Sequence, residues 1–378
     1  MRVAQVITFV SADGAYGGPV QVMRAQTAEM SRRGHQVTIF AGWDGIAAIA
    51  EAPDIRAVGA TTRSLSSRYR FGTMMSPGLV RQMRALRHEF DVVHVHAARD
   101  FVTLPTALAA GDRPLILQPH GMLVPDGRPQ TRVTDLILTR RVLRRAAALL
   151  ALTEQEEQQL SVLTDGRAVI TRLPNGIANQ PRATTVAANP RPKIVFCARL
   201  HPRKRVAHFL DMAVALHSSG VAADFVIAGP DGGEQIEVER RIRELGSPDW
   251  LRFVGALSPE QVPAFLADAD IYVLPSYDEP FPMTVLEAMR ESTAVVVTDT
   301  CGIAARLSAR GAASVTDGSL PSLVDAVRTL ACSPARRAQQ IRLAGEALAS
   351  EYSMQAVGDQ LETIYMRAVE SSASRHGN

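Results

Sequence analysis

Two acidic residues with a fixed spacing are candidates for binding a ligand rich in hydroxyl groups. Glu279 and Glu287 are eight positions apart in the stretch SYDEPFPMTVLEAM. The apolar run 270–276 predicts a buried strand and the segment 284–291 predicts a helix, so Glu279 should lie in the connecting loop and Glu287 about one turn inside the helix. The start of that helix offers unpaired backbone N–H groups to an anion such as a diphosphate, which leaves both carboxylates to bind neutral hydroxyls.

A pair of cations follows another predicted strand, at 193–199. Arg199 ends this strand and Lys204 comes five residues later. The planar fork of an arginine and the mobile point charge of a lysine can together hold two phosphates. A salt-bridged surface pair is the alternative interpretation.

A histidine also lies where open α/β sheets bind their ligands, at the carboxyl end of a strand. His120 ends the predicted strand 114–120 and is followed by Gly121. His94 and His96 alternate on the predicted strand 91–97. Because no carboxylate or cysteine completes a ligand set with them, we interpret these two as structural or as part of an acceptor side.

Gly17 and Gly18 lie between the first predicted strand and a helix. Glycines let the backbone come close to a ligand, and a helix start favours a phosphate. An ordinary strand-to-helix turn is the alternative.

Two basic stretches have surface alternatives. In 61–72, Arg63, Arg68 and Arg70 alternate with aromatic residues, which suits either an anionic or lipid-phosphate acceptor or a plain polar loop. In 138–152, four arginines precede an apolar run. A basic amphipathic helix can lie on an anionic membrane, but a solvated helix entering a buried strand explains the pattern more simply.

Alternating apolar runs and helical stretches predict an α/β fold with parallel sheets in two successive doubly wound domains. The segment 175–192 has the composition of a linker, with the domain boundary near residue 186. Asn175 and Gly176 should provide the positive φ of a tight turn, and Thr153 with Glu156 should form a capping box. The predicted strands are 3–10, 36–42, 91–97, 114–120, 147–153 and 168–174 in the first half, and 193–199, 224–230, 251–257, 270–276 and 294–299 in the second.

Composition sets the class of protein. A chain of 378 residues with 46% hydrophobic and 21% charged residues is globular and long enough for two domains. A net charge of +3 gives no argument for nucleic acid, and three scattered cysteines suit a reducing compartment. The N-terminal residues 1–14 superficially resemble a signal peptide, but they lack a small-x-small cleavage site, so we expect a first buried strand.

Taken in order, these motifs resemble the retaining GT-B glycosyltransferases of the large family 4 type. The resemblance rests on E-x7-E in PSYDEPFPMTVLEAM, on R-x4-K, on His120-Gly121 and on Gly17-Gly18, and it covers nearly the whole chain. It implies two Rossmann-like domains facing across a cleft. The first, 1–186, would be the acceptor side and the second, 187–353, would bind the nucleotide sugar, with a helix at about 354–370 returning to the first.

The resemblance also implies a role for each motif. Glu279 would contact hydroxyls of the donor sugar, Glu287 the ribose, and Arg199 with Lys204 the departing diphosphate. Turns at 228–233 and 253–258 would enclose the base. The implied catalytic residues are His120, Arg199, Lys204 and Glu279; the implied donor-binding residues are Gly17, Gly18, Arg199, Lys204, Gly229, Val254, Glu279, Phe281, Pro282, Met283 and Glu287; Arg63, Arg68 and Arg70 would lie on the acceptor side.

The chain departs from the family pattern at a few positions. Relatives typically have glycine where this chain has Arg205 and Ser292, proline where it has Ala294, and often glycine where it has Ile303. These changes affect loop and helix-end geometry, so they weaken expectations about donor choice more than those about fold.

The resulting expectation is a retaining glycosyltransferase that moves a hexosyl-type sugar from a nucleotide-diphosphate sugar, most simply a UDP- or GDP-sugar, to a hydroxyl of a glycan, lipid-linked or small-molecule acceptor. It would need no cofactor and no metal, because two cations serve the diphosphate. The D-x-D at Asp268 and Asp270 is interpreted as a pair of helix-end and turn acids rather than as a metal site. We expect a cytoplasmic protein, with peripheral membrane contact through the N-terminal domain as a further option. The alternatives are a nucleotide-sugar epimerase on the same fold, a nicotinamide oxidoreductase, which the absence of GxGxxG disfavours, and an inactive sugar-nucleotide-binding protein.

Overall fold

The computed structural model describes residues 1–10, 17–44, 49, 55–64, 71–126, 131, 134–178 and 191–376. The chain divides into two compact units. Unit 1 comprises Met1–Gly176 with Met354–Asn378, and unit 2 comprises Ile177–Ser353. The boundary predicted near residue 186 falls within 179–190, outside the described residues.

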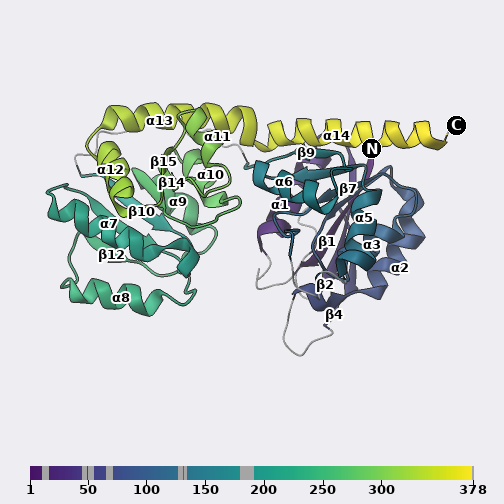
Figure 1. Ribbon diagram of the computed structural model, residues 1–378, viewed down its shortest axis with the longest axis horizontal. Coiled ribbons are helices and arrows are strands. Elements are labelled where there is room, and N and C mark those ends of the chain that lie inside the picture. Colours follow the sequence, from purple (N-terminus) through teal and green to yellow (C-terminus); the bar gives the residue numbers. More distant parts are fainter. Residues whose placement is uncertain are drawn as a thin grey trace. The chain divides into compact units, whose positions relative to one another are not determined.

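Unit 1 is built on a seven-stranded parallel sheet (Figure 1). Its strands follow the order β3-β2-β1-β6-β7-β8-β9. Between β3 and β6 along the chain, the short strands β4 and β5 form a separate antiparallel pair. The bounds are β1 Arg2–Val10, β2 Gln36–Trp43, β3 Arg56–Thr61, β4 Arg63–Ser64, β5 Met74–Met75, β6 Val92–His96, β7 Leu115–Gln118, β8 Ala148–Ala151 and β9 Ile170–Arg172.

Helices cover both faces of this sheet because its strands alternate apolar side chains toward each face. Val3, Val92 and Ile116 pack against α1 and α14, whereas Val6, Val95 and Leu117 pack against α2, α3, α5 and α6. The bounds are α1 Gly17–Arg32, α2 Pro77–Leu86, α3 Thr103–Ala109, α5 Arg140–Arg145, α6 Glu154–Leu163 and α14 Met354–His376.

The C-terminal helix α14 is an integral part of unit 1. Val357, Leu361 and Tyr365 are fully buried against the sheet. At Gly358 an added Cβ would lie 2.7 Å from the Arg33 Nε atom, so glycine allows α1 and α14 to approach closely. Arg33 then donates to Asp359 at 2.7 Å and to the Gln355 carbonyl at 2.8 Å, which fixes the helix polar edge.

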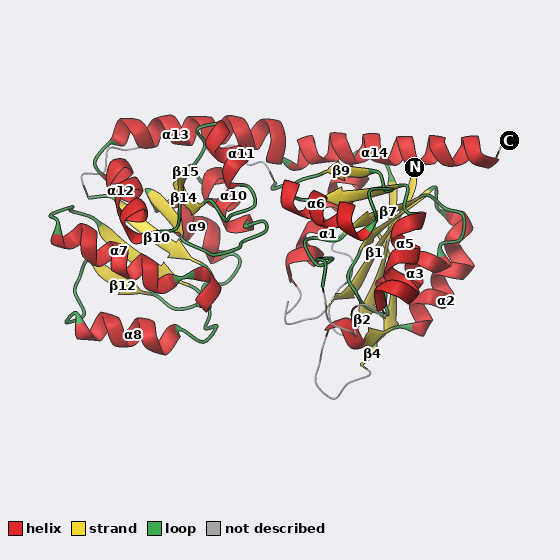
Figure 2. Cartoon of the chain, viewed as in Figure 1, coloured by secondary structure: helices red, strands yellow, loops and turns green. Residues whose placement is uncertain are grey.

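Unit 2 contains a six-stranded parallel sheet in the order β12-β11-β10-β13-β14-β15. Helices α7 and α12 pack on one face, and α10 and α13 pack on the other (Figure 2). The strands are β10 Lys193–Cys197, β11 Asp224–Ala228, β12 Leu251–Phe253, β13 Ile271–Leu274, β14 Ala294–Thr298 and β15 Ser314–Thr316. The helices are α7 Val206–Ser218, α8 Gln235–Glu244, α9 Gln261–Ala267, α10 Met283–Arg290, α11 Ala304–Ala309, α12 Leu320–Ala331 and α13 Pro334–Ala347.

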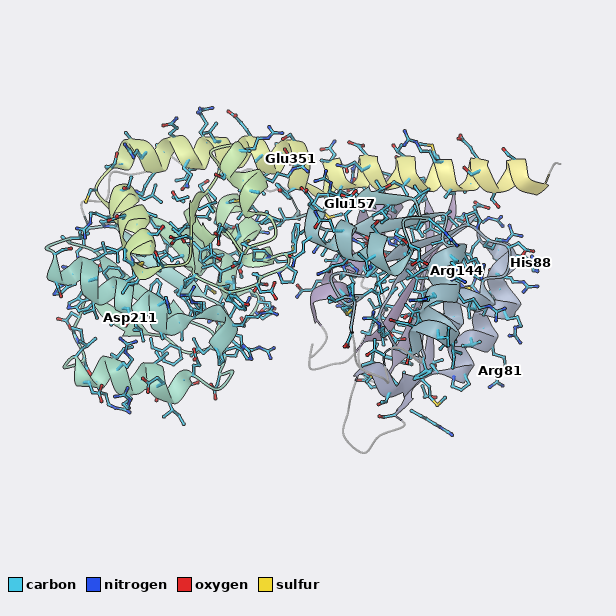
Figure 3. The ribbon with its side chains drawn as sticks, viewed as in Figure 1. Arg81, His88, Arg144, Glu157, Asp211 and Glu351 are labelled. Atoms are coloured by element: carbon cyan, nitrogen blue, oxygen red, sulfur yellow. The ribbon has the colours of Figure 1, made fainter. Side chains whose placement is uncertain are left out.

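A π-helical turn at Leu348–Tyr352 ends unit 2. Its Glu351, labelled in Figure 3, accepts from Arg306 of α11 and from Arg310, which directly follows this helix. The carbonyl of Tyr352 accepts from the Ile177 N–H at 2.8 Å, so both ends of the unit 2 chain are held together.

The predicted α/β class is confirmed, and each predicted strand overlaps an observed one. The positive φ predicted at Asn175 and Gly176 is wrong, since neither residue is among those with positive φ. Gly176 is instead needed because an added Cβ would lie 2.5 Å from the Met354 sulfur. Within the described part of the chain, no helix is both long and apolar enough to span a bilayer.

Candidate active site

The strand order of unit 2 reverses between β10 and β13, which are hydrogen-bonded neighbours. Such a reversal opens a crevice at the carboxyl ends of the two strands, which is where open α/β sheets bind ligands. Arg199 and Lys204 follow β10, and Glu279 and Glu287 follow β13. The topology therefore brings the predicted cations and carboxylates to the same edge of the sheet.

Lys204 and Glu279 form an ion pair at this edge. Lys204 ends the short 3-10 helix Pro202–Lys204, and its ammonium donates to the Glu279 Oε2 atom. The guanidinium of Arg203 lies 3.7 Å from the same oxygen. The side chains of Lys204 and Glu279 are only 20% and 10% exposed, so water screens this pair weakly. The sequence interpretation did not include Arg203, although the basic run HPRKR contains it.

Arg199 has a different environment. It is exposed, and its guanidinium has no hydrogen-bond or ion-pair partner among the described residues. Its stem lies beside Gly232, where an added Cβ would be 2.9 Å from the Arg199 Cγ atom. The Arg199 guanidinium is thus unpaired among the described residues and, at the sheet reversal, is available to an anionic ligand.

Helix α10 begins between Glu279 and Glu287 without a side-chain cap. Its N-cap residue is Pro282, which cannot accept a hydrogen bond through a side chain. By contrast, Thr153, Ser319 and Ser333 cap α6, α12 and α13 with their hydroxyls. An uncapped helix start keeps backbone donors available to an anion.

The residues that precede α10 are held by packing. Pro282 is buried and Met283 is half-buried. The Phe281 ring is 9% exposed and lies 6.3 Å from the ring of Tyr352. These contacts hold the loop and so fix where α10 starts.

Glu287 lies inside α10, as predicted, and is half-buried. Burial raises the pKa of the Glu287 carboxyl above its ordinary value of 4.5, while the positive charge of Arg290 opposes this effect and the negative charge of Glu291 adds to it. Burial, together with the Glu287 charge, also raises the pKa of the Cys197 thiol to about 12. Glu287 therefore faces the end of β10, on the side of the sheet reversal.

The turns predicted near the base use their backbone donors within the protein. The Gly229 N–H donates to the Gly255 carbonyl and the Val254 N–H to the Ile227 carbonyl, both at 2.9 Å. Gly229 has φ 149°, and an added Cβ would lie 1.9 Å from the Ala198 carbonyl oxygen. Its glycine identity thus has a structural cause. Val254 is 47% exposed, which leaves its side chain accessible to a ligand.

Gly17 and Gly18 begin α1 in unit 1, directly after residues 11–16, which lie outside the described residues. An added Cβ at Gly18 would meet no atom within 4 Å, and Gly18 is not among the glycines with positive φ. No contact of the described chain requires glycine there.

His120 lies beyond β7 with φ 55°, and Gly121 follows with φ 75°. Two buried side chains hold this left-handed turn. The His96 Nδ1 atom lies 2.7 Å from the His120 Nε2 atom, and the Glu156 carboxylate accepts from the Gly121 N–H at 2.6 Å. Burial raises the pKa of Glu156.

The predicted N-cap of α6 is confirmed, since the Thr153 hydroxyl accepts from the Glu156 N–H at 3.2 Å. The reciprocal half of the capping box is wrong. Glu156 accepts from Leu152 and Gly121 instead of from Thr153. A sequence pattern of local contacts could not indicate this longer-range bond to the histidine turn.

The arginines of the two predicted basic stretches differ in their surroundings. Arg63 is exposed on β4, whereas Arg68 and Arg70 lie outside the described residues. Arg145 does not join the exposed arginines of α5, because it donates to the Ala107 carbonyl at 3.1 Å and so caps α3. Among the described residues, no group of three or more His, Cys, Asp or Glu side chains could hold a metal ion.

Comparison with known families agrees with this geometry over both units. The family model "Glycosyl transferases group 1" matches residues 179–345, and the model "Glycosyltransferase Family 4" matches residues 16–180. The chain belongs to the group 1, family 4 glycosyltransferases.

Individual relatives are similar over most of the chain. Alpha-D-kanosaminyltransferase of Streptomyces kanamyceticus is 28% identical over 76% of this chain and 80% of its own length. Glycogen synthase of Mycobacterium tuberculosis is 28% identical over 74% of this chain and 69% of its own length.

Solved structures show the fold of this glycosyltransferase. HepE of Anabaena, solved in complex with UDP, superimposes with a TM-score of 0.73 at 20% identity over 96% of this chain and 99% of HepE. The two parallel-sheet domains are those of the GT-B fold, as predicted.

Proposed function

We propose that this glycosyltransferase is a retaining enzyme that transfers a hexosyl-type sugar from a nucleotide-diphosphate sugar to an acceptor hydroxyl. The observation that carries the proposal is the arrangement at the unit 2 sheet reversal. An uncommitted cation, Arg199, a paired cation, Lys204, and an uncapped helix, α10, lie at one sheet edge with two partly buried carboxylates.

Each group has a distinct part in the proposed reaction. The diphosphate would bind between the start of α10 and the side chains of Arg199 and Lys204, while Glu279 and Glu287 would bind hydroxyls of the sugar and the ribose. As the bond from the anomeric carbon to the phosphate oxygen breaks, negative charge grows on the diphosphate, and both cations stabilise it. The acceptor oxygen would bond to that carbon on the face the diphosphate leaves, and its proton would pass to the departing phosphate oxygen, which gives retention.

The nucleotide is proposed to be a diphosphate of uridine or guanosine. The UDP complexes of HepE support this class, because that fold covers both domains of the present chain. We further propose that no metal takes part, since Arg199 and Lys204 supply the positive charge that a divalent cation would otherwise give the diphosphate.

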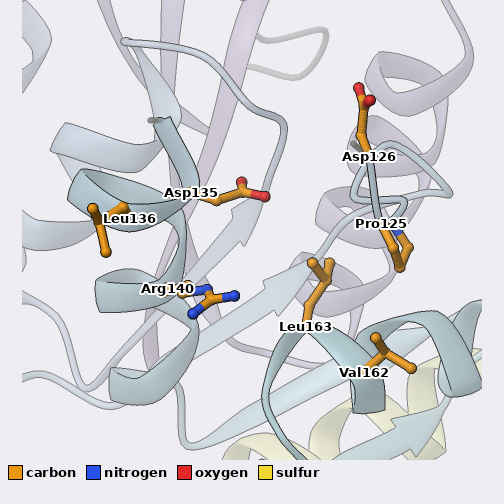
Figure 4. A pocket seen from close by; sticks show the side chains of 7 residues that line it. All are labelled: Pro125, Asp126, Asp135, Leu136, Arg140, Val162 and Leu163. Carbon is orange, nitrogen blue, oxygen red and sulfur yellow. The ribbon is translucent and has the colours of Figure 1, made fainter. Parts of the chain in front are cut away.

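We also propose a peripheral contact between unit 1 and an anionic membrane for a lipid-linked acceptor. Leu136 and Ile137 are 74% and 60% exposed next to the exposed Arg140, Arg141 and Arg144. Leu136 and Arg140 also line a hollow of about 390 Å³ together with Val162, which is 67% exposed (Figure 4). Exposed apolar groups beside arginines are the combination that anionic lipid surfaces bind. Co-sedimentation with phosphatidylglycerol vesicles but not with phosphatidylcholine vesicles is expected, and equal recovery from both would refute this contact.

The direct test of the donor site is thermal stability with UDP-, GDP-, ADP- and TDP-sugars in EDTA, for the wild type and Glu287→Ala. A ligand that binds only the folded protein raises the melting temperature by mass action. We expect UDP- or GDP-sugars to stabilise the wild type strongly and Glu287→Ala weakly. Transfer to a hydroxyl acceptor with an unchanged anomeric configuration, read by NMR of the product, would establish retention. Inversion, or a strict need for added divalent metal, would refute the mechanism.

A further inference from the structure

A chain of buried hydrogen bonds connects His120 with the C-terminal helix of unit 1. The His120 Nε2 atom lies 2.7 Å from the His96 Nδ1 atom, and the His96 Nε2 atom lies 2.7 Å from the Gln5 amide oxygen. The Gln5 amide nitrogen donates to the Tyr365 hydroxyl at 3.2 Å. Gln5, His96 and Tyr365 are fully buried, so water cannot substitute for these bonds.

The imidazoles of this chain are uncharged. Burial lowers the pKa of His120 to about 3 and holds the pKa of His96 well below its ordinary value of 6.5. Burial likewise lowers the pKa of the neighbouring His94 to about 3. A neutral imidazole has one N–H donor and one acceptor nitrogen, so the donor-to-acceptor direction of one hydrogen bond to the ring fixes the direction of the other.

The Gln5 amide sets that direction. Its oxygen faces His96, so the His96 Nε2 atom must carry the proton and the His96 Nδ1 atom must accept. The His120 Nε2 atom is then the donor to His96, and the His120 Nδ1 atom is left without a proton. The Tyr365 hydroxyl accepts from the Gln5 amide nitrogen, which holds the amide in this orientation, and it also lies 2.7 Å from the His94 Nδ1 atom.

The His120 Nδ1 atom is buried and has no hydrogen-bond partner among the described residues. A buried acceptor of this kind is costly to leave unpaired, which indicates that a ligand satisfies it.

We propose that Gln5, His96 and Tyr365 are positioning residues that fix His120 as a hydrogen-bond acceptor, with its Nδ1 atom receiving a hydroxyl of a sugar substrate. The inference rests on the proposed function for the identity of that ligand. It makes α14 part of the apparatus that presents His120, and it selects a neutral hydroxyl at this position over a carboxylate, which cannot donate.

Tyr365→Phe is the informative variant because it keeps the aromatic ring in the core and removes only the hydroxyl. The Gln5 amide nitrogen then loses its acceptor, so the amide can rotate and donate to His96. That rotation would reverse the chain and place a proton on the His120 Nδ1 atom. Thr363→Ala removes an exposed hydroxyl from the same helix, one that bonds only the Asp359 carbonyl, and is the matched control.

The test uses full-length protein labelled with ¹⁵N in histidine, with two-bond ¹H–¹⁵N spectra that separate protonated from unprotonated ring nitrogens. Loss of one signal set in His120→Asn assigns His120. In the wild type and in Thr363→Ala, His120 should be the Nε2–H tautomer near neutral pH, while Tyr365→Phe should show the Nδ1–H tautomer. A wild-type His120 with its proton on Nδ1 would overturn the proposal without any variant.

Steady-state transfer supplies the functional readout. Tyr365→Phe should lower kcat by about tenfold, the loss expected for one misdirected hydrogen bond, while Thr363→Ala retains wild-type kcat. An altered tautomer with unchanged kcat would refute the link between the chain and the sugar. Because the spectra need no substrate, a protein that transfers no sugar at all would refute the proposed function and still report the tautomer.

Discussion

Replacing Glu279 by glutamine should separate the binding of the nucleotide from the binding of the sugar. The change keeps the shape of the side chain and removes the charge that pairs with Lys204. Under the proposed function, Glu279 contacts the sugar, whereas Lys204 contacts the diphosphate. Glu279 and the diphosphate therefore share one ammonium group, and they carry charges of the same sign.

The size of the effect follows from that shared contact. Two oxygens that both bind the Lys204 ammonium at ordinary hydrogen-bond lengths lie at most about 6 Å apart. Two unit charges at this separation repel by about 0.7 kcal/mol at the dielectric constant of water and by about 2.8 kcal/mol at an effective value near 20. Free UDP or GDP should thus bind Glu279→Gln roughly 3- to 100-fold more tightly than the wild type.

Stability and kcat should fall, although the affinity for the free nucleotide rises. The unliganded variant should lose about 1–3 kcal/mol of stability, because Lys204 is only 20% exposed and loses its partner. Affinity for the intact nucleotide sugar should gain less than affinity for the free nucleotide, and kcat should fall, because an amide replaces the carboxylate acceptor for a sugar hydroxyl.

Calorimetric titration with the nucleotide and with the nucleotide sugar measures both affinities. Asp268→Asn is the matched control, since Asp268 pairs with Lys193 at the opposite end of β10 and should leave both affinities unchanged. If Glu279→Gln weakens nucleotide binding as much as Lys204→Met does, Glu279 serves only to position Lys204, and the assignment of Glu279 to the sugar is wrong.

Three further outcomes are expected. Gly18→Ala should keep or raise the melting temperature, because the added methyl group meets no atom within 4 Å and alanine favours a helix over glycine by about 0.5–1 kcal/mol. The same change should reduce kcat/KM at least about tenfold. Unchanged activity would assign Gly18 to an ordinary turn. Burial raises the pKa of Glu287, so the stability gained from its protonated form is fully present below pH 4.5 and is lost as the pH rises through the folded-state pKa. Glu287→Gln should therefore have a higher melting temperature than the wild type at pH 7 and the same melting temperature at pH 4. Equal melting temperatures at both pH values would contradict the burial effect. Ser292→Gly should stabilise unit 2 by about 0.5–1 kcal/mol. Ser292 has φ 63°, a left-handed conformation that costs a non-glycine residue about 1–2 kcal/mol, and the greater chain entropy of glycine in the unfolded state offsets part of this gain. A lower melting temperature would show that the serine hydroxyl contributes more to stability than the backbone strain costs.

The sequence was sufficient for the interior strands of both sheets and for the edge strands β9 and β12, but not for the edge strands β3 and β15. Strands such as β6 and β13 are continuous apolar runs, because helices cover both of their faces. The edge strand β3, RAVGAT, is half-exposed along its length, and β15 has only three residues, so neither gives an apolar run. The prediction missed both for this reason.

The candidate site was predictable wherever a motif is local. The spacing from Glu279 to Glu287 spans one strand-to-helix turn, so the position of Glu287 in α10 could be predicted. The contacts of His120 could not be, because they join residues far apart in the sequence: Gln5, His96, Glu156 and Tyr365 lie on β1, β6, α6 and α14. No periodicity connects a glutamine in the first strand with a tyrosine in the last helix.

Departures from a family motif carry different weight once backbone geometry is considered. At Arg205 and Ser292, where the family resemblance predicts glycine, the backbone is left-handed, with φ 55° and 63°, despite the larger side chains. Arg205 also donates to the Gly318 carbonyl at 2.8 Å, which partly offsets the strain. Both residues therefore hold a backbone conformation that glycine would adopt without strain. Gly18 is the opposite case, because the described backbone does not require glycine and the chain nevertheless has it. A glycine without an internal cause is better evidence for the close approach of a ligand than a motif glycine whose conformation alone demands it.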